Sequence, residues 1–263
     1  MDLMPGSTIA KHPSGKREIV FTEENHAYVD DAGFDYTSVT KLIHGAFPPF
    51  DAKAAAAQKS ARTGVPAEEY LREWDRIRDT ASNNGTRTHE NCERQILGRF
   101  AEMNQPRDEE ERLRFRAAWY AVETLKAQYR KIEPEKLVFS PRFLVAGSID
   151  MLCRIDDNRF EIGDWKFVKA LNYQSYGGRT GNHPATLALP DCNFYHYALQ
   201  LNIYKMILKL EGYVPMTSEV GHFLMRYNPE ARTFERIELP DLALPAMMLL
   251  AYNATHDGLD LPF

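Results

Sequence analysis

The stretch AGSIDMLCRIDDNRFEIGDWK, residues 146–166, decides the predicted fold. It contains two strand-like runs, Gly147–Ile155 and Arg159–Lys166, and the Asp-Asp-Asn triplet between them is typical of a turn. A third strand is predicted just before them, over Lys136–Val145, with a turn at Ala146-Gly147. Three consecutive strands joined by short turns therefore form the centre of the predicted sheet.

Helical patterns flank this centre on both sides in the sequence. Helices are predicted from Pro66 to about Phe100 in two pieces separated at Asn83-Asn84-Gly85, over Asp108–Lys131, over about Phe194–Leu210 and near the C-terminus. Smaller predicted elements are a hairpin of Glu18–Phe21 and His26–Val29, helices capped at Thr37-Ser38 and Asp51, and strands near Glu219–Tyr227 and Thr233–Leu239. This order predicts an α/β (α+β) fold with a mixed central sheet flanked by helices.

The chain has no repeat, low-complexity tract or obvious linker that would divide its 263 residues. We therefore expect a flexible N-terminal tail over residues 1–16 and a single domain over 17–263. Within that domain, 17–104 is predicted to be a mainly helical elaboration, 105–240 the catalytic core, and 241–263 a C-terminal helix and tail.

Composition excludes several classes of protein. Hydrophobic residues make up 44% and charged residues 26%, a globular balance that excludes a disordered or rod-like chain. No apolar run approaches the ~18 residues of a membrane span, and the N-terminus shows no targeting pattern, so we expect a soluble intracellular protein, cytoplasmic in a bacterial or phage setting. Three scattered cysteines without CxxC spacing argue against a zinc finger or an iron–sulfur cluster. The net charge of −5 neither supports nor excludes nucleic acid, because a basic groove is a local feature.

Acidic side chains and a lysine mark the two central strands. Asp164 and Lys166 are two residues apart and share a face, whereas Trp165 points away and leaves its carbonyl beside that face. An antiparallel arrangement would place Asp150 next to Asp164, and two close carboxylates repel unless a cation lies between them. Hard oxygen ligands favour Mg²⁺ or Mn²⁺. The alternative is a solvated hairpin with two surface acids.

Two helices add polar side chains at helical spacing. Gly85, His89 and Glu93 share one face, where Gly85 allows close approach of another backbone and His89 offers a further metal ligand. A zinc-protease pattern would need a second histidine where Glu93 stands. On the later helix, Gln200 and Tyr204 share a face, from which they could reach a phosphate or a metal-bound water.

Four motifs occur in order along the chain. They are G-x-x-x-H-x-x-x-E from Gly85, G-x-I-D ending at Asp150, D-x-K from Asp164, and Q-L-x-x-Y from Gln200. In combination they resemble the PD-(D/E)XK nuclease superfamily, within its RecB-like group. The DWK motif and the helical N-terminal half are most similar to mitochondrial genome-maintenance exonucleases and related phage nucleases.

The resemblance covers about Gly85 to Tyr227 and departs from the family at two points. Ile149-Asp150 replaces the proline–aspartate pair of the family name. Phe167 stands where the family usually has a small hydroxyl residue, a departure that concerns a local phosphate contact rather than the metal site. No P-loop motif occurs, so no nucleotide cofactor is expected.

The resemblance implies a Mg²⁺- or Mn²⁺-dependent deoxyribonuclease. The catalytic residues it implies are Lys166, Asp150, Asp164, Glu93, Gln200 and Tyr204, and the metal ligands are His89, Asp150, Asp164 and the carbonyl of Trp165. Lys166 would position or deprotonate the attacking water, and Glu93 would act beside the metal or on a second ion. Gln200 and Tyr204 would orient the water or hold a neighbouring phosphate.

The implied substrate is DNA, and the implied activity is that of an exonuclease acting on DNA ends, with single-stranded DNA favoured, in DNA processing, recombination or repair. A structure-specific endonuclease and a catalytically silent nucleic-acid-binding protein on the same fold are the alternatives.

In the resembling exonucleases, the region corresponding to Lys53–Arg99 forms an arch that admits single strands. The polar stretch 171–192, with Arg179 and His183, is either a substrate-binding segment or disordered. His196 is expected on an exposed polar stripe.

Overall fold

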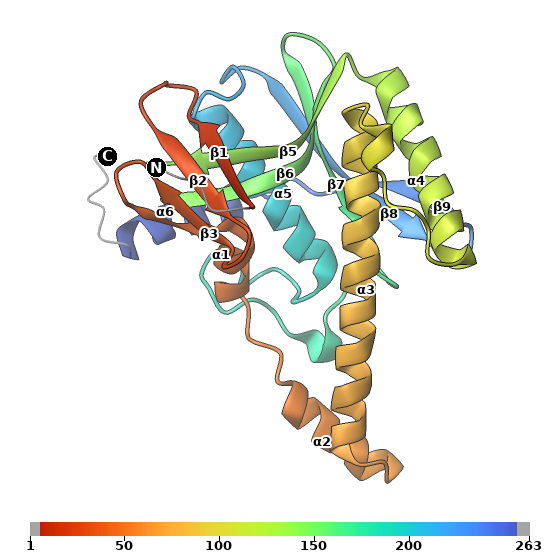
Figure 1. Ribbon diagram of the computed structural model, residues 1–263. Helices are drawn as coiled ribbons and strands as arrows, with labels where there is room; N and C mark the ends of the chain where they lie inside the picture. Colours follow the sequence, from red (N-terminus) through yellow and green to blue (C-terminus); the bar gives the residue numbers. More distant parts are fainter. Residues whose placement is uncertain (1–5, 257–263) are drawn as a thin grey trace.

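The computed structural model describes residues 6–256, and a nine-stranded mixed sheet runs through it (Figure 1). The strands are β1 (Ser7–Lys11), β2 (Glu18–Thr22), β3 (Ala27–Asp30), β4 (Asp35–Ser38), β5 (Lys131–Ser140), β6 (Val145–Arg154), β7 (Arg159–Lys166), β8 (Glu219–Asn228) and β9 (Thr233–Glu238). Their order is β1-β2-β3-β4-β6-β7-β8-β9, with β5 paired to β6 off this path. The β4–β6 and β7–β8 pairs are parallel and the others antiparallel, so the predicted mixed sheet is confirmed.

Strand β6 is the branching point of this sheet, and its pairing leaves a short gap. One edge of β6 pairs with β5 along almost its whole length. On the other edge, β4 pairs with Val145 and Ala146, and β7 pairs with residues 151–154. Residues 147–150 lie between these two partners, so neither β4 nor β7 forms a ladder with this part of β6. Side chains from other elements can therefore approach the strand at this point.

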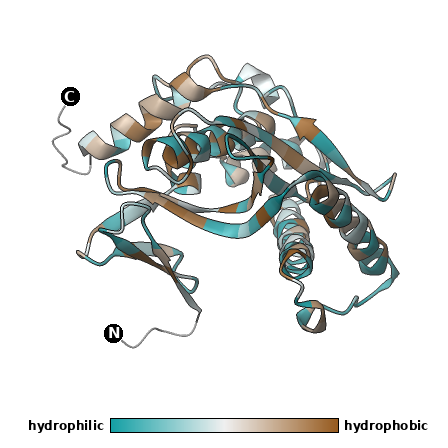
Figure 2. Ribbon diagram, turned by 90° about the horizontal axis from the view of Figure 1, so that it is seen from above, coloured by the Kyte–Doolittle hydropathy of each residue, from teal (hydrophilic) through white to brown (hydrophobic). Residues whose placement is uncertain are grey.

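Helices cover both faces of the sheet, as Figure 2 shows from above. They are α1 (Val39–Gly45), α2 (Ala52–Thr63), α3 (Ala67–Ile96), α4 (Glu109–Gln128), α5 (Asn193–Leu210) and α6 (Ala243–His256), with 3-10 turns at Phe100–Glu102 and Tyr176–Gly178. Strand β8 shows the two-faced packing clearly. Leu224 joins the core under α1, α5 and α6, whereas Phe223 and Met225 join the core under α4 and the end of α3. The predicted sheet flanked by helices is therefore confirmed.

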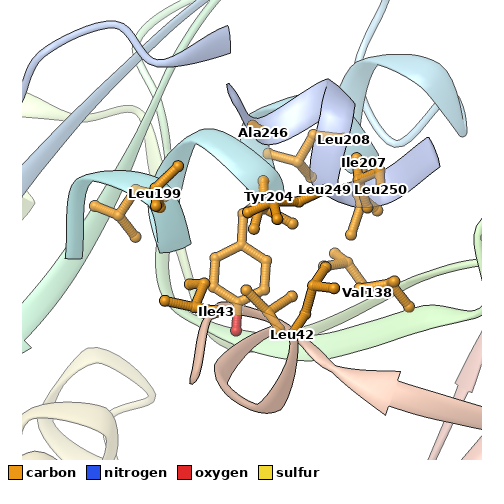
Figure 3. Packing of buried hydrophobic residues seen from close by; sticks show 14 of the residues in the cluster. Leu42, Ile43, Val138, Leu199, Tyr204, Ile207, Leu208, Ala246, Leu249 and Leu250 are labelled. Atoms are coloured by element: carbon orange, nitrogen blue, oxygen red, sulfur yellow. The ribbon is translucent and has the colours of Figure 1, made fainter. Parts of the chain in front are cut away.

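The larger core lies between the sheet and the α1, α5 and α6 layer (Figure 3). On α5, Leu199, Ile203 and Ile207 recur every four residues and are fully buried, which is the pattern of a helix face packed on a sheet. Tyr204 lies in the same cluster and is 4% exposed. Helix α5 is therefore fixed against the strands that carry the acidic residues.

Helix α3 is continuous over 30 residues, so the predicted break at Asn83-Asn84-Gly85 is wrong. These residues are weak helix formers in isolation. A tertiary contact holds Asn84, since Arg107 Nη2 donates to its Oδ1 at 2.7 Å, and within the helix Thr88 Oγ1 donates to the Asn84 carbonyl at 2.8 Å. The N-terminal half of α3 extends beyond the sheet together with α2, so the two helices project from the body (Figure 1).

Strand β1 lies within the predicted flexible tail over residues 1–16. That prediction is wrong for Ser7–Lys11, which pairs in full with β2. The adjoining His12 is buried, and its Nε2 lies 3.2 Å from Glu211 Oε2 at the end of α5. Residues 1–5 of the predicted tail, and residues 257–263 of the predicted C-terminal tail, lie outside the described residues.

The two predicted helix caps are confirmed. Ser38 caps α1 by accepting from the backbone N–H of Lys41, and Asp51 caps α2 by accepting from that of Ala54. The three cysteines, Cys92, Cys153 and Cys192, are free and buried. In the described part of the chain, no helix is long and apolar enough to cross a membrane.

Candidate metal centre

Asp150 and Asp164 lie across from each other on β6 and β7, at the point where these strands separate. The last ladder pair joins Met151 to Gly163, and Asp150 and Asp164 are the next residues along that register. The backbone N–H of Trp165 donates to Asp150 Oδ2 at 2.9 Å, which fixes the orientation of this carboxylate. The structure thus brings together the two acids that the sequence predicted to be neighbours.

His89 reaches the same place from α3, an element remote in sequence from β6. Its Nε2 lies 2.7 Å from Asp150 Oδ2, and its Nδ1 lies 3.1 Å from Glu135 Oε1. One ligand atom each from His89, Glu135 and Asp150 lies within 4.8 Å of the other two. Imidazole nitrogens and carboxylate oxygens are both common ligands of divalent metal ions in proteins. These residues therefore fit a divalent metal ion.

Glu135, on β5, is a member of this group that the sequence did not reveal. It lies across from Asp150 in the antiparallel register of β5 and β6. Its φ of +46° is in the left-handed region, an uncommon conformation for a non-glycine residue and one that suggests local constraint. Glu135 Oε2 accepts from Ser148 Oγ at 2.8 Å, so a neighbour on β6 holds the carboxylate in place.

The position of one turn explains why Glu135 was missed. The chain turns between β5 and β6 at residues 141–144, whereas Ala146-Gly147, the predicted turn, lies within β6. A turn at Ala146-Gly147 would have placed Phe143 across from Asp150. The observed turn places Glu135 there instead, so the correction of the turn also changes the set of candidate ligands.

Asp164 and Lys166 form a buried ion pair beside this group. Asp164 is 2% exposed, and Lys166 Nζ lies 2.5 Å from its Oδ2 and 4.6 Å from the ring centre of Tyr197. Burial raises the pKa of Asp164, and the charge of Asp150 raises it further, to about 7, against the opposing charge of Lys166. Burial lowers the pKa of Lys166, but the charges of Asp164 and Asp150 outweigh burial and raise it above its usual value.

The protonation of His89 also indicates a site built for positive charge. Burial lowers the pKa of His89, but the charge and hydrogen bonds of Asp150 and Glu135 raise it well above its usual value. Burial raises the pKa of Asp150, and the charge of His89 outweighs this and lowers it. Without a metal ion, the imidazolium therefore supplies the positive charge that the carboxylates need.

Among the predicted metal ligands, His89 and Asp150 belong to the three-residue group, whereas Asp164 does not. Glu93, predicted to be catalytic, also lies outside the group. Glu93 is one helical turn beyond His89, where burial raises its pKa and the charge of Glu135 raises it further. The metal-ligand role of Asp164, the role of the Trp165 carbonyl and the catalytic role of Glu93 stay predictions.

Gln200 and Tyr204 are next to each other on α5, as their spacing predicted. Burial raises the pKa of Tyr204 well above its usual value, while a hydrogen bond from Gln200 opposes this. A Cβ atom built on Gly147 would lie 2.5 Å from the Tyr204 hydroxyl oxygen, so the tyrosine packs directly on the unpaired part of β6. Gly147 is therefore required for this close approach.

A cavity of about 540 Å³ opens between α3, the end of β7 and α5. Its walls include His89, Lys166 and Tyr197, so one member of the candidate metal group and the lysine face the same space. Gly85 was predicted to let another backbone approach, but the side chain of Phe167 lies there instead. A Cβ on Gly85 would be 3.5 Å from Phe167 Cδ2, an ordinary contact, so a glycine is not needed for this packing.

Comparisons with known proteins give little further information. No protein-family model matches the chain, and no curated protein matches it. Among solved structures, it is similar to a protein from Eubacterium rectale provisionally named an exonuclease, with 10% identity and a TM-score of 0.43. The match covers 66% of this chain and 65% of the other, just under two thirds of that protein's length. A similarity at this level does not identify an activity, which has to be inferred from the side chains of the chain itself.

Proposed function

We propose that the chain is a Mg²⁺- or Mn²⁺-dependent deoxyribonuclease of the PD-(D/E)XK superfamily, in its RecB-like group. We propose further that it is an exonuclease acting on the ends of DNA, preferably single-stranded, in DNA processing, recombination or repair. The observation that carries this proposal is the convergence of His89, Glu135 and Asp150 beside the Asp164–Lys166 pair. Metal ligands beside a cationic hydrogen-bond donor promote phosphodiester hydrolysis, because negative charge accumulates on the phosphate.

The residues that would hold the ion are His89, Glu135 and Asp150, with Asp164 and the Trp165 carbonyl next to them. The chemistry that such an ion supplies is polarisation of a phosphate oxygen and a lower pKa of a water molecule. His89 would bind a metal only as the neutral imidazole, so the imidazolium would have to give up one ring proton to solvent. Asp150 keeps its orientation throughout, because its Oδ2 accepts the backbone N–H of Trp165.

Lys166 is placed to act on the water and the phosphate. Its ammonium group lies between the Asp164 carboxylate and the ring of Tyr197 and lines the cavity. In this position its remaining N–H groups donate to the attacking water and to a phosphate oxygen, which orients the first and reduces charge on the second. Gln200 and Tyr204 support this arrangement from α5.

The preference for single-stranded ends is supported by the helices beside the cavity. Helices α2 and α3 project from the body, and the inner part of α3 contributes His89 to the site (Figure 1). We expect a strand that reaches the cavity to pass along this projection. Its basic side chains are Lys53, Lys59, Arg62, Arg72 and Arg76, whereas Arg78 is paired with Asp75 and Asp79. Cations of this kind bind phosphates without sequence preference.

The test is a cleavage gel with end-labelled linear and circular substrates, each single-stranded and double-stranded, in Mg²⁺, Mn²⁺ or EDTA. We expect degradation of linear single strands in either metal, none in EDTA, and intact circular DNA. Cleavage of circular DNA would replace the exonuclease with an endonuclease. DNA binding without cleavage in any metal would support a silent binding protein.

The variant Asp164→Ala separates chemistry from binding. We expect it to lose cleavage while it retains most of its affinity for DNA, because affinity depends on many phosphate contacts outside this pair. Binding is measured by fluorescence anisotropy with a labelled oligonucleotide. Equal losses of binding and cleavage would indicate that Asp164 has a structural role.

A further inference from the structure

A second cavity, of about 540 Å³, lies on the α1 side of α5 and is not used by the proposed chemistry. Three segments remote in sequence form its walls: the end of α1 with the connection to α2, the 171–192 stretch, and the start of α5. The 171–192 stretch is held there by defined hydrogen bonds, since Thr186 Oγ1 donates to the Ala46 carbonyl at 2.7 Å. We call this cavity the α1–α5 pocket. Its volume is in the range of small-ligand sites.

The polar groups of the α1–α5 pocket neutralise one another. Asp191 pairs with Arg179 through Oδ2 at 3.4 Å and with His196 Nε2 through Oδ1 at 3.1 Å. Arg179 also donates to the Pro48 carbonyl at 3.2 Å. The His196 ring lies 4.2 Å from that of Phe47, so His196 is not the exposed stripe residue that the sequence predicted. The guanidinium of Arg179 is therefore already paired within the pocket and is not free to hold a phosphate.

The mouth of the α1–α5 pocket carries two aromatic rings that are mostly in solvent. Phe50 is 70% exposed and Tyr176 is 83% exposed, although both line the cavity. Large exposed aromatic side chains cost free energy in water and are typical of binding surfaces. A neutral, flat ligand with a hydrogen-bonding edge fits aromatic rings at the mouth and polar groups inside.

The α1–α5 pocket lies close to the candidate metal centre along α5, and this position suggests a nucleobase as the flat ligand. His196 shares a face of α5 with Gln200, about 6 Å further along the helix axis. It also adjoins Tyr197, whose ring contacts Lys166. The two cavities are therefore lined by adjacent residues of α5, His196 and Tyr197, so that neighbouring nucleotides of one strand can reach both. The bases of single strands are free to leave the stack and bind aromatic side chains.

We infer that the α1–α5 pocket binds one unstacked nucleobase of a single-stranded substrate, through ring contacts with Phe50 and Tyr176. The inference rests on the proposed nuclease function and adds a base-binding subsite to it. The subsite binds the base and leaves the phosphates to the metal centre and to the basic side chains of α2 and α3. It thus sets the position of the strand relative to the scissile bond.

The experiment steps a single abasic residue along a labelled single-stranded oligonucleotide and measures affinity by anisotropy, with Ca²⁺ in place of Mg²⁺. In the wild-type protein we expect one position where base removal weakens binding by about 5- to 150-fold, the range for one stacked base. In the double variant Phe50→Ala/Tyr176→Ala that position is lost. The matched control is Tyr120→Ala, since Tyr120 is 66% exposed on α4 and outside the pocket.

Each outcome separates the subsite from the nuclease activity. Loss of the abasic effect in the double variant, with the effect retained in Tyr120→Ala, supports the subsite. An unchanged abasic profile in the double variant overturns it, and if the wild-type protein still cleaves DNA, the nuclease proposal stands. If the wild-type protein neither binds nor cleaves single-stranded DNA, both proposals are overturned.

Discussion

Helix α3 contributes to two groups of charged side chains. One group has more cationic than acidic side chains, and the other has more acidic than cationic ones. On α4, Glu111 is 1% exposed and pairs with three arginines, Arg87, Arg107 and Arg114. At the candidate metal centre, four carboxylates lie near two cationic side chains. The carboxylates belong to Glu93, Glu135, Asp150 and Asp164, and the cations are His89 and Lys166.

The pKa values of two buried acids express this difference. Burial alone would raise the pKa of Glu111, but hydrogen bonds from Arg87 and Arg107 outweigh it and lower the pKa to about 2. Burial and the charge of Asp150 raise the pKa of Asp164 to about 7. In the first cluster the buried acid is fully paired with arginines, and the cluster joins α3 to α4. The second cluster has excess negative charge that a bound cation would offset. A buried acid is thus a sign of function where positive charge is in deficit.

The largest effect is expected at the metal centre. We expect the cleavage rate of Asp150→Asn to fall by a factor on the order of 10³ or more. The amide is a weak metal ligand, and loss of the metal leaves the negative charge of the transition state without a counter-charge. Affinity for single-stranded DNA should change little. Initial rates are compared with those of Asp157→Asn, a control at an exposed turn. A residual rate near that of the wild type would remove Asp150 from the catalytic site.

In the Glu111 cluster we expect a loss of stability rather than a loss of cleavage. We expect Glu111→Gln to lower the free energy of unfolding by about 3 kcal/mol, because it leaves the buried end of an arginine cluster without its counter-charge. Urea unfolding monitored by circular dichroism measures this, with the exposed neighbour in Glu110→Gln as the control. Mn²⁺ affinity should remain that of the wild type. A Glu111 variant that loses metal binding but not stability would contradict the structural role assigned to this cluster.

The same cluster has a predictable pH dependence. The folded pKa of Glu111 is about 2, below its ordinary value of 4.5, so its contribution to stability is present above pH 4.5. As pH falls from about 4.5 toward 2, the carboxylate is protonated first in the unfolded chain, and the contribution is lost. The stability gap between the wild type and Glu111→Gln should therefore shrink over this interval in urea titrations. A constant gap would show that Glu111 acts by packing alone.

The smallest expected effect is a gain in stability rather than a loss. In the metal-free protein, Asp164→Asn should raise the unfolding free energy by about 1 kcal/mol, or about 2–4 °C in the thermal midpoint, because it removes one of the repelling carboxylates. Differential scanning fluorimetry in EDTA provides the comparison. A lower midpoint would mean that the ion pair with Lys166 outweighs the repulsion from Asp150.

The sequence predicted those site residues whose spacing reports their geometry. Asp164 and Lys166 share a face because strand residues alternate, and His89 was found from its helical spacing to Glu93. Glu135 could not be predicted in this way, since its place across from Asp150 depends on where the chain turns between β5 and β6. A shift of that turn changes every pair of the two strands.

The fold was predictable where periodicity is strong, and less so where tertiary contacts decide. The strands and helices from β6 onward have regular patterns, and the mixed sheet follows from them. The unbroken course of α3 could not be predicted, because Arg107, which is distant in sequence, holds Asn84 in the helix. Strand β1 is a further example, since its short, partly exposed sequence is ordered by pairing with β2.

The most direct test of the metal centre is anomalous diffraction from crystals soaked in Mn²⁺. We predict an ion about 2.0–2.3 Å from a nitrogen of His89, with Asp150 and Glu135 oxygens also bound to it. Such a result would establish the ligand set and show that the imidazolium gives way to a metal cation. An ion bound elsewhere, or a His89 ring that keeps its contact with Asp150 in Mn²⁺-soaked crystals of active protein, would contradict the account.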